Sequence, residues 1–340
     1  MSAQAVARVE RSTLTGRDYI ETADWSVPEI DEALAATREL KASFKEGRPH
    51  RLLPDKTLFM LFLDKSTRTR NAFESGMTQL GGHAIYLDSE KTQVAHGESP
   101  KDMGIILSGY GHGLAIRHDL APYEGNAWMR EIAKWAEIPL INLQCDVDHP
   151  TQTLADLMTL REQLGDDLRG LKVAVTWAYA PSYAKPMSVP QGLLTLLPRF
   201  GIEVTYAHPP GFELMPEAIA KAATGAEEGG GSIRFVDSME EAFSGADVVY
   251  PKSWGSLQAF SDEAAGLAHA RQFTSWICDA EKLALAEPGA LYMHCLPADR
   301  GSEVTDEVID GPRSVVYPEA ENRMHTGKAL MALTMGGFGA

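Results

Sequence analysis

The fold expected of this chain is decided by residues 57–70, which read TLFMLFLDKSTRTR. The apolar half of this stretch, Leu58–Leu63, is rich in β-forming residues and predicts a buried strand. Ser66 is a good N-cap, so the polar half predicts a helix whose first turn is Thr67–Arg70. A strand that runs directly into a helix is typical of a parallel sheet covered by helices, which favours the α/β class.

The same alternation of apolar runs and helical stretches continues along the chain. We expect strands at Leu58–Leu63, Ala84–Leu87, Leu114–Arg117, Leu140–Leu143, Lys172–Trp177, Glu203–Ala207, Ile233–Val236, Asp247–Tyr250 and Leu291–His294. A helix over Thr151–Leu164 leads into the polar turn Gly165-Asp166-Asp167, where we place a domain boundary. The sequence therefore predicts two domains, residues 1–165 and 166–318, each with a parallel sheet flanked by helices, and a last helix after Glu319, within residues 319–340.

Composition and charge narrow the class of function. The 31 basic and 47 acidic residues give a net charge of −16, which argues against nucleic acid as a partner. Three scattered cysteines do not form a disulfide framework, and neither CxxC nor HExxH is present, so we expect no metal site and a reducing cytoplasm. The first residues lack the apolar core of a signal peptide, and the longest uncharged stretch, residues 103–116, is short, so we expect no membrane segment.

Residues 66–70 form the first candidate site. The first turn of a helix offers free backbone N–H groups and the positive end of the helix dipole, and therefore usually carries Asp or Glu. Here it carries Arg68, Arg70 and three hydroxyl side chains, a set that suits the oxygens of a phosphate. The sequence predicts a phosphate-binding turn at the carboxyl edge of the first sheet; the alternative is a solvated basic turn.

Two further polar clusters follow predicted strands. In Asp148–Gln152, the proline opens a helix and holds the preceding histidine extended, so that its imidazole can reach over the sheet edge. In Tyr292–Arg300, the apolar run breaks at Leu296-Pro297, so the carbonyl of Leu296 can face a cleft. Cys295 is expected to be a small buried side chain, because no base at a recognisable spacing marks it as a covalent nucleophile.

The loop after Lys172–Trp177 argues against a dinucleotide cofactor. A dinucleotide-binding domain would carry Gly-x-Gly-x-x-Gly at this point, whereas residues 178–190 contain three prolines and no glycine. We therefore disfavour a nicotinamide-dependent dehydrogenase and keep a nucleotide-dependent α/β enzyme only as an alternative.

Three motifs in this order resemble those of the aspartate and ornithine carbamoyltransferase family: Ser-Thr-Arg-Thr-Arg at 66–70, His-Pro-Thr-Gln at 149–152 and His-Cys-Leu-Pro at 294–297. The resemblance implies a carbamoyl phosphate-binding domain and an amine-acceptor-binding domain, joined by helices, with the last helix packed back on the first domain. It also implies a homotrimer or a multiple of trimers. The active site would lie in the cleft between the domains and be completed by a loop of the neighbouring subunit, and no cofactor would be needed.

The resemblance also assigns roles to individual residues. Carbamoyl phosphate would be bound by Ser66, Thr67, Arg68, Thr69, Gln93, His96, Arg117, His149, Gln152 and Arg323. Of these, Gln93 or His96 would reach in from the adjacent subunit. The catalytic residues would be Arg68, Arg117, His149 and Cys295, acting without a metal ion. The acceptor would be bound by Gln144, Lys252, Ser253, Trp254, Cys295, Leu296 and Arg300.

The acceptor segment departs from that of ordinary ornithine enzymes. Those carry an aspartate-containing Ser-Met-Gly segment, whereas this chain has Lys252-Ser253-Trp254-Gly255, and a lysine cannot hold an α-ammonium group as an aspartate does. This segment and the proline-rich loop 181–190 resemble the knotted branch of the family, so we expect a knot in the second domain. Asp299 stands where the acyl-ornithine enzymes of that branch have an arginine, and the likeness is closest to a knotted group without an assigned substrate.

The resulting hypothesis is a carbamoyltransferase that uses carbamoyl phosphate, carbamoylates ornithine or an ornithine-like molecule and releases phosphate. The acceptor could equally be an acylated or shortened diamine, or a different amine or amide. The alternative function is a family member that keeps the fold but works as a non-catalytic or regulatory binding protein.

Overall fold

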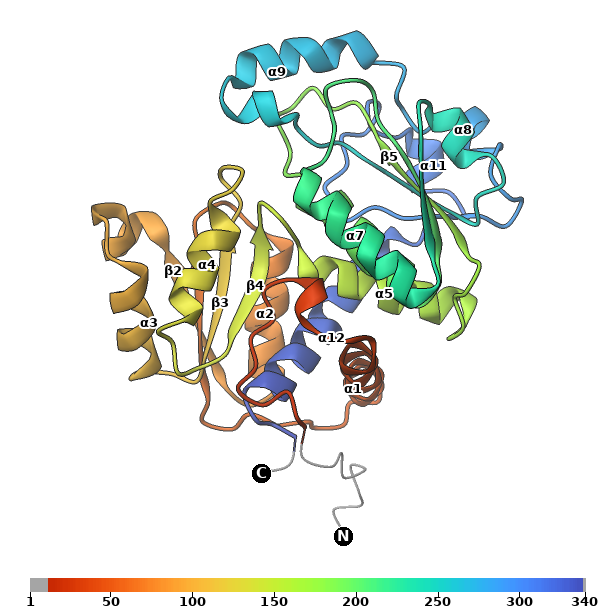
Figure 1. The fold of residues 1–340 in the computed structure, drawn as a ribbon. Coiled ribbons are helices and arrows are strands. Elements are labelled where there is room, and N and C mark those ends of the chain that lie inside the picture. The colour runs from red at the N-terminus through yellow and green to blue at the C-terminus, as the bar shows by residue number, and fades with distance from the viewer. Residues whose placement is uncertain (1–11, 339–340) are drawn as a thin grey trace.

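The computed structural model describes residues 12–338 and consists of two domains, each built on a parallel sheet (Figure 1). The first sheet has the order β2-β1-β3-β4 and the second the order β7-β6-β5-β8-β9. All neighbouring strands run parallel, so the carboxyl ends of each sheet meet at one edge. The strands are β1 (Thr57–Phe62), β2 (His83–Asp88), β3 (Gly113–His118), β4 (Leu140–Cys145), β5 (Lys172–Trp177), β6 (Glu203–Ala207), β7 (Ser232–Val236), β8 (Val248–Lys252) and β9 (Leu291–Tyr292).

Helices connect the strands and cover both sheets. The α-helices are α1 (Val27–Lys45), α2 (Arg68–Gln79), α3 (Pro100–Ser108), α4 (Gly125–Ala133), α5 (Pro150–Leu164), α6 (Ser188–Leu196), α7 (Pro216–Gly229), α8 (Met239–Phe243), α9 (Glu263–Ala270), α10 (Ala280–Leu283), α11 (Asp306–Ile309) and α12 (Val316–Thr334). The 3₁₀ helices are η1 (Thr22–Asp24), η2 (Ser89–Lys91), η3 (Gln93–His96), η4 (Leu197–Phe200), η5 (Leu257–Phe260) and η6 (Arg271–Phe273).

The predicted strands are confirmed, with ends that differ by at most two residues. β9 ends at Tyr292 rather than His294, because the N–H of His294 donates to a carboxylate oxygen of Glu319 at 2.9 Å instead of continuing a strand. Two helix starts were predicted wrongly. Thr67, not Ser66, is the N-cap of α2, since the first helical bond is accepted by the Thr67 carbonyl. α12 begins at Val316, before Glu319, whose N–H already bonds to the preceding turn.

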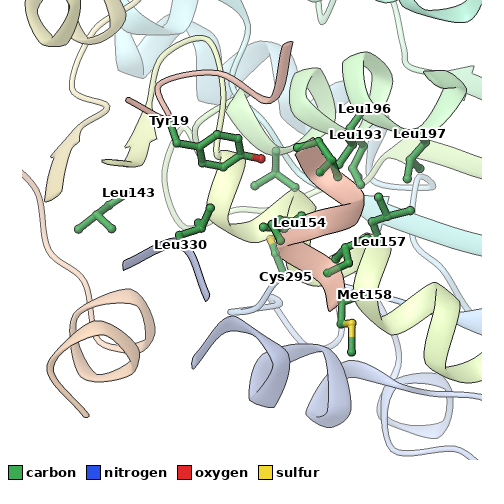
Figure 2. Close-up of a cluster of buried hydrophobic side chains, with 14 of the residues drawn as sticks. Tyr19, Leu143, Leu154, Leu157, Met158, Leu193, Leu196, Leu197, Cys295 and Leu330 are labelled. Carbon is green, nitrogen blue, oxygen red and sulfur yellow. The ribbon is translucent and has the colours of Figure 1, made fainter. Parts of the chain in front are cut away.

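Helices α5 and α12 form the packed junction between the two domains. Leu154, Leu157 and Met158 of α5 recur at i, i+3 and i+4, so they share one face of the helix. Figure 2 shows this face packed among other buried side chains, including Leu193 and Leu196 of α6 and Leu330 of α12. α12 also packs against α1 and α2. α5, whose first turn carries predicted site residues, is therefore held between β4 of the first sheet and the helices α6 and α12.

Within residues 12–338, no helix combines the length and the apolar character needed to cross a membrane. The domain boundaries at residues 165/166 and 318/319 and the knot stay predictions.

We expect the substitution Leu154→Ala to lower the free energy of unfolding by about 2–5 kcal/mol, because the fully buried side chain leaves a cavity in the junction. The matched control is Leu164→Ala on the same helix, where the side chain is 40% exposed and the change should stay within about 0.5 kcal/mol. Chemical denaturation measures both. Equal losses for the two variants would contradict the assignment of this core.

Candidate active site

Three neighbouring strands of the first sheet bring predicted donor-binding and acceptor-binding residues to one edge. β1 leads through residues 63–67 into α2, β3 carries Arg117 near its end, and β4 carries Gln144 near its end. Arg117 is in register with Phe62 of β1 on one side and with Gln144 of β4 on the other. His149 directly precedes α5, so its side chain lies over the same edge.

These side chains line a cavity of about 220 Å³, to which both domains contribute. The second domain supplies the loop after β5, the end of β8 and the loop after β9. The lining residues are Lys65, Ser66, Thr67, Arg68, Thr69, Arg117, Gln144, His149, Gln152, Tyr183, Lys185, Pro186, Val189, Lys252, Cys295, Leu296, Pro297 and Arg323. The predicted site residues that do not line it are Gln93, His96, Ser253, Trp254 and Arg300.

Three buried or half-buried cations of the cavity have no acidic partner among residues 12–338: Arg68, Lys252 and Arg323. Lys252 and Arg323 are buried, and Arg68 is half-buried with an unpartnered Nε. Arg117, by contrast, is neutralised by Asp119 through two hydrogen bonds of 2.8 and 3.1 Å. Buried charges without partners are costly, so the cavity is built to receive an anion.

The clustered positive charges of the cavity change the pKa values of neighbouring groups. Burial and the nearby Arg68 lower the pKa of Arg323 to about 10. Burial and the charges of Arg323 and Arg117 lower the pKa of His149 well below its usual value, so the imidazole is neutral at pH 7. Its Nε2 lies 3.4 Å from Nη2 of Arg323, which also donates to the Thr69 hydroxyl. A neutral imidazole beside a fixed guanidinium can bind the carbonyl of a ligand without taking a proton from solvent.

The carbonyl of Leu296 faces the cavity, as the sequence predicted, and accepts a hydrogen bond of 2.6 Å from Nη2 of Arg68. The backbone reaches this orientation in an unexpected way, because Leu296 has a left-handed φ of 55° instead of an extended one. Its N–H donates to Nδ1 of His294 at 2.8 Å, which holds the turn in place. The carbonyl of Leu296 is thus a backbone acceptor that points into the cavity next to the guanidinium of Arg68.

Lys185 and Glu303 form a buried ion pair of 2.5 Å beside the cavity. Burial alone would raise the pKa of Glu303, but His294, Lys185 and Lys252 together hold it below its usual range. Glu303 also accepts the backbone N–H of Ser253 at 2.7 Å. The carboxylate of Glu303 is therefore bound by Lys185 and the Ser253 N–H within the cavity wall and does not face the cavity.

Cys295 lines the cavity as a buried thiol, and burial raises its pKa. A thiol with a raised pKa is a weak nucleophile at neutral pH, in keeping with its predicted role as a small buried side chain. In the described part of the chain, no three His, Cys, Asp or Glu side chains are grouped so that they could hold a metal ion.

Three residues predicted to bind the acceptor have side chains that do not line the cavity. The guanidinium of Arg300 is bound by the nearer acids Asp306 and Asp310 at 2.5–2.8 Å, so it does not turn to the cavity. The indole of Trp254 donates to a backbone carbonyl at 2.9 Å and is buried in an aromatic cluster. Ser253 faces a separate small hollow with Trp254.

Gln93 and His96 lie on η3, away from the cavity of their own chain. Their side chains are hydrogen-bonded to each other at 3.2 Å and accessible to solvent. Their predicted role, in which they act on a neighbouring subunit, stays a prediction.

Sequence reasoning missed several lining residues: Lys65, Tyr183, Lys185, Pro186, Val189 and Pro297. Four of them belong to the proline-rich loop, which the sequence marked as unusual but to which no role was given. A lysine between prolines in a stiff loop was the available signal. Its partner Glu303 is 118 residues away, and no local pattern encodes that contact.

Two family models match the chain. The model for the carbamoyl-P binding domain of aspartate/ornithine carbamoyltransferase matches residues 17–162. The model for the Asp/Orn binding domain of the same family matches residues 183–334. The first matched segment contains the whole first sheet, and the second contains the second sheet except β5. Together they include every residue that lines the cavity.

Relatives and solved structures agree with these matches. Ornithine carbamoyltransferase of Thermococcus kodakarensis is 38% identical over 326 residues, which cover 96% of this chain and 98% of that protein. YgeW of Escherichia coli K12, whose carbamoyltransferase activity is named only provisionally, is 39% identical over 345 residues, which cover 91% of this chain and 87% of that protein. The structure of ornithine carbamoyltransferase from Pyrococcus furiosus has a TM-score of 0.86 at 37% identity and covers 95% of this chain and 98% of that one.

An acetylornithine transcarbamylase solved with acetylcitrulline has a TM-score of 0.85 at 32% identity, and the match covers 93% of this chain and 98% of that one. The relatives thus include enzymes named for ornithine and for acetylornithine, and one protein named for no acceptor. The similarity to these relatives extends along both domains, in sequence and in fold. The chain therefore belongs to the aspartate/ornithine carbamoyltransferase family.

Proposed function

We propose that this carbamoyltransferase moves the carbamoyl group of carbamoyl phosphate to the amine of a small, ornithine-like acceptor that carries a carboxylate. The observation that carries the proposal is the cavity with three unpaired cations, Arg68, Lys252 and Arg323. A phosphate dianion and a carboxylate supply the negative charge that this cavity lacks. The structure of a related N-acetyl-L-ornithine transcarbamylase was solved with carbamyl phosphate and N-succinyl-L-norvaline, which have these charges.

The turn 66–69 and Arg68 would hold the phosphate of the donor. Free N–H groups at the start of α2 and the guanidinium of Arg68 suit phosphate oxygens. Arg117 and the neutral His149 would hold the carbamoyl carbonyl. Gln152 and the carbonyl of Leu296 offer acceptors for the carbamoyl NH₂ group.

The reaction then needs little beyond orientation and charge. The lone pair of the neutral amine forms a bond to the carbonyl carbon, the bond from this carbon to the phosphate oxygen breaks, and the amine proton leaves with the phosphate. Negative charge grows on the carbonyl oxygen and on the departing phosphate, and Arg68, Arg117 and Thr69 are placed to stabilise it. Because His149 is already neutral, its titration should produce no acid limb near its usual pKa.

The acceptor half of the cavity is defined by Lys252. Its Nζ donates to the carbonyl of Ser253 at 2.6 Å and keeps further donor capacity. Burial lowers its pKa, and a bound carboxylate would restore it. None of the residues that line the cavity is Asp or Glu, so the lining offers no carboxylate to an α-ammonium group. This charge balance favours an acceptor whose α-nitrogen is masked over free ornithine.

Residues of η3 would complete the site between subunits. Gln93 and His96 are solvent-accessible and do not reach the cavity of their own chain. We include a homotrimer in the proposal, with these two side chains acting on the neighbouring cavity. Light scattering of the purified protein measures this state.

The decisive experiment is a carbamoylation assay read by mass spectrometry. The protein is incubated with carbamoyl phosphate and, one at a time, ornithine, N-acetylornithine, N-succinylornithine, putrescine, aspartate and oxamate. We expect phosphate release together with a carbamoylated product from an acceptor that carries a carboxylate, and more product from a masked than from a free α-amine. If carbamoyl phosphate neither binds nor yields product with any acceptor, the proposed function is wrong.

Replacement of Arg68 by methionine should remove donor binding. We expect kcat/KM for carbamoyl phosphate to fall about 100-fold or more, because the guanidinium would bind the phosphate that leaves in the reaction. Inorganic phosphate should stabilise the wild type against heat but not this variant. The control is Arg234→Met, an exposed arginine paired with Glu241 far from the cavity, which should leave both measurements unchanged. A phosphate-dependent shift of normal size in Arg68→Met would remove Arg68 from the donor site.

The substitution Lys252→Met should act on the acceptor alone. We expect the acceptor KM to rise about 10-fold to 100-fold through loss of one charged hydrogen bond, with the KM of carbamoyl phosphate changed less than about twofold. Steady-state kinetics with each substrate varied in turn separates the two constants. A rise in the donor KM instead would assign Lys252 to the phosphate.

A further inference from the structure

Two acidic side chains meet in the interior behind the cavity, Asp156 of α5 and Glu319 of α12. Both are fully buried and are hydrogen-bonded to each other. Neither forms an ion pair with any residue between 12 and 338, and neither lines the cavity. The mechanism proposed above makes no direct use of them.

Gln152 connects this acid pair to the cavity. Its NH₂ group donates to Oδ1 of Asp156 at 2.7 Å and to Oε1 of Glu319 at 3.2 Å. Because both partners accept, the amide nitrogen must face the pair and Oε1 of Gln152 must face away from it. This oxygen is buried, has no partner in the described chain, and belongs to a side chain that lines the cavity. It is an acceptor that awaits a donor from a bound molecule.

We propose that Asp156 and Glu319 are positioning residues that fix the polarity of the Gln152 amide, and that this makes the site selective for an acyl phosphate that bears an amino group. The inference rests on the proposed function and specifies how the donor is recognised. An NH₂ group on the acyl carbon satisfies Oε1 of Gln152. A methyl group in the same place leaves that oxygen buried and unpaired, which is costly.

Protonation of the pair fits this role. Burial raises the pKa of Asp156 to about 7 and raises that of Glu319 well above its usual value. Arg323 is a full cation that faces the pair and lowers the pKa of Asp156, but burial outweighs its effect. The other facing groups are the hydroxyl of Tyr250 and the backbone N–H of His294. The pair therefore keeps a proton near pH 7, and its remaining oxygens accept from Gln152.

The test compares two donors of nearly equal shape, carbamoyl phosphate and acetyl phosphate. Calorimetry at pH 7 gives the dissociation constant of each without any acceptor present. We expect wild-type protein to prefer carbamoyl phosphate by about tenfold or more. The substitution Glu319→Met removes one oxygen that fixes the amide and should lower this preference several-fold. Glu319→Gln keeps one accepting oxygen that can face Gln152, and should retain more of the preference than Glu319→Met.

Asp156→Leu provides a second, independent variant if Glu319→Met does not fold. Tyr250→Phe is the matched control: it removes a hydrogen bond to the pair without removing an acceptor of Gln152, and the preference should stay at the wild-type value. A merely structural role would weaken both donors equally, so the ratio is the informative quantity. Unchanged ratios in folded Glu319→Met or Asp156→Leu would overturn the inference.

Failure of the inference and failure of the proposed function give different results. If wild-type protein binds carbamoyl phosphate and acetyl phosphate equally well, the proposed donor site is supported, but the inference about selectivity for the amino group is wrong. If it binds neither, the proposed function itself is wrong.

Discussion

The structure depends on holding uncompensated positive charge at the junction of two sheets. Arg68, Lys252 and Arg323 come from α2, β8 and α12, elements that are far apart in the sequence. Their mutual repulsion and their desolvation oppose the assembly of the junction. The apolar contacts of α5, α6 and α12 stabilise the junction against this repulsion. The charged cavity therefore depends on the hydrophobic core beside it.

The distribution of acids follows from the same constraint. Three acidic side chains close to the cavity are occupied by other partners: Asp119 by Arg117, Glu303 by Lys185, and Glu319 by Asp156. A free carboxylate on the wall would neutralise one of the three cations and take the place of the ligand. The chain thus keeps its negative charges within reach but turned away, and the cavity stays attractive to anions although the whole protein carries a net charge of −16.

Sequence reasoning worked where structure is local. Alternating apolar runs predict the strands within two residues, and the motif at 66–70 marks a helix start whose residues line the cavity. It did not reveal competing partners. The guanidinium of Arg300, which the resemblance assigned to the acceptor, is hydrogen-bonded to Asp306 and Asp310. The wall formed by Lys185 and Glu303 joins segments 118 residues apart, which no periodicity or motif predicts.

The packing of α12 has a consequence for the order in which the protein can assemble during its synthesis. This helix covers α2 and α1 of the first domain, and Lys328 on it reaches Gln79 of α2 across 249 residues of chain. A nascent chain on the ribosome therefore makes the whole first sheet long before the helix that seals it, and leaves the apolar side chains Phe73 and Met77 uncovered. The core of the amino-terminal half can therefore be completed only after α12 has left the ribosome, and until then its apolar side chains are open to non-native contacts.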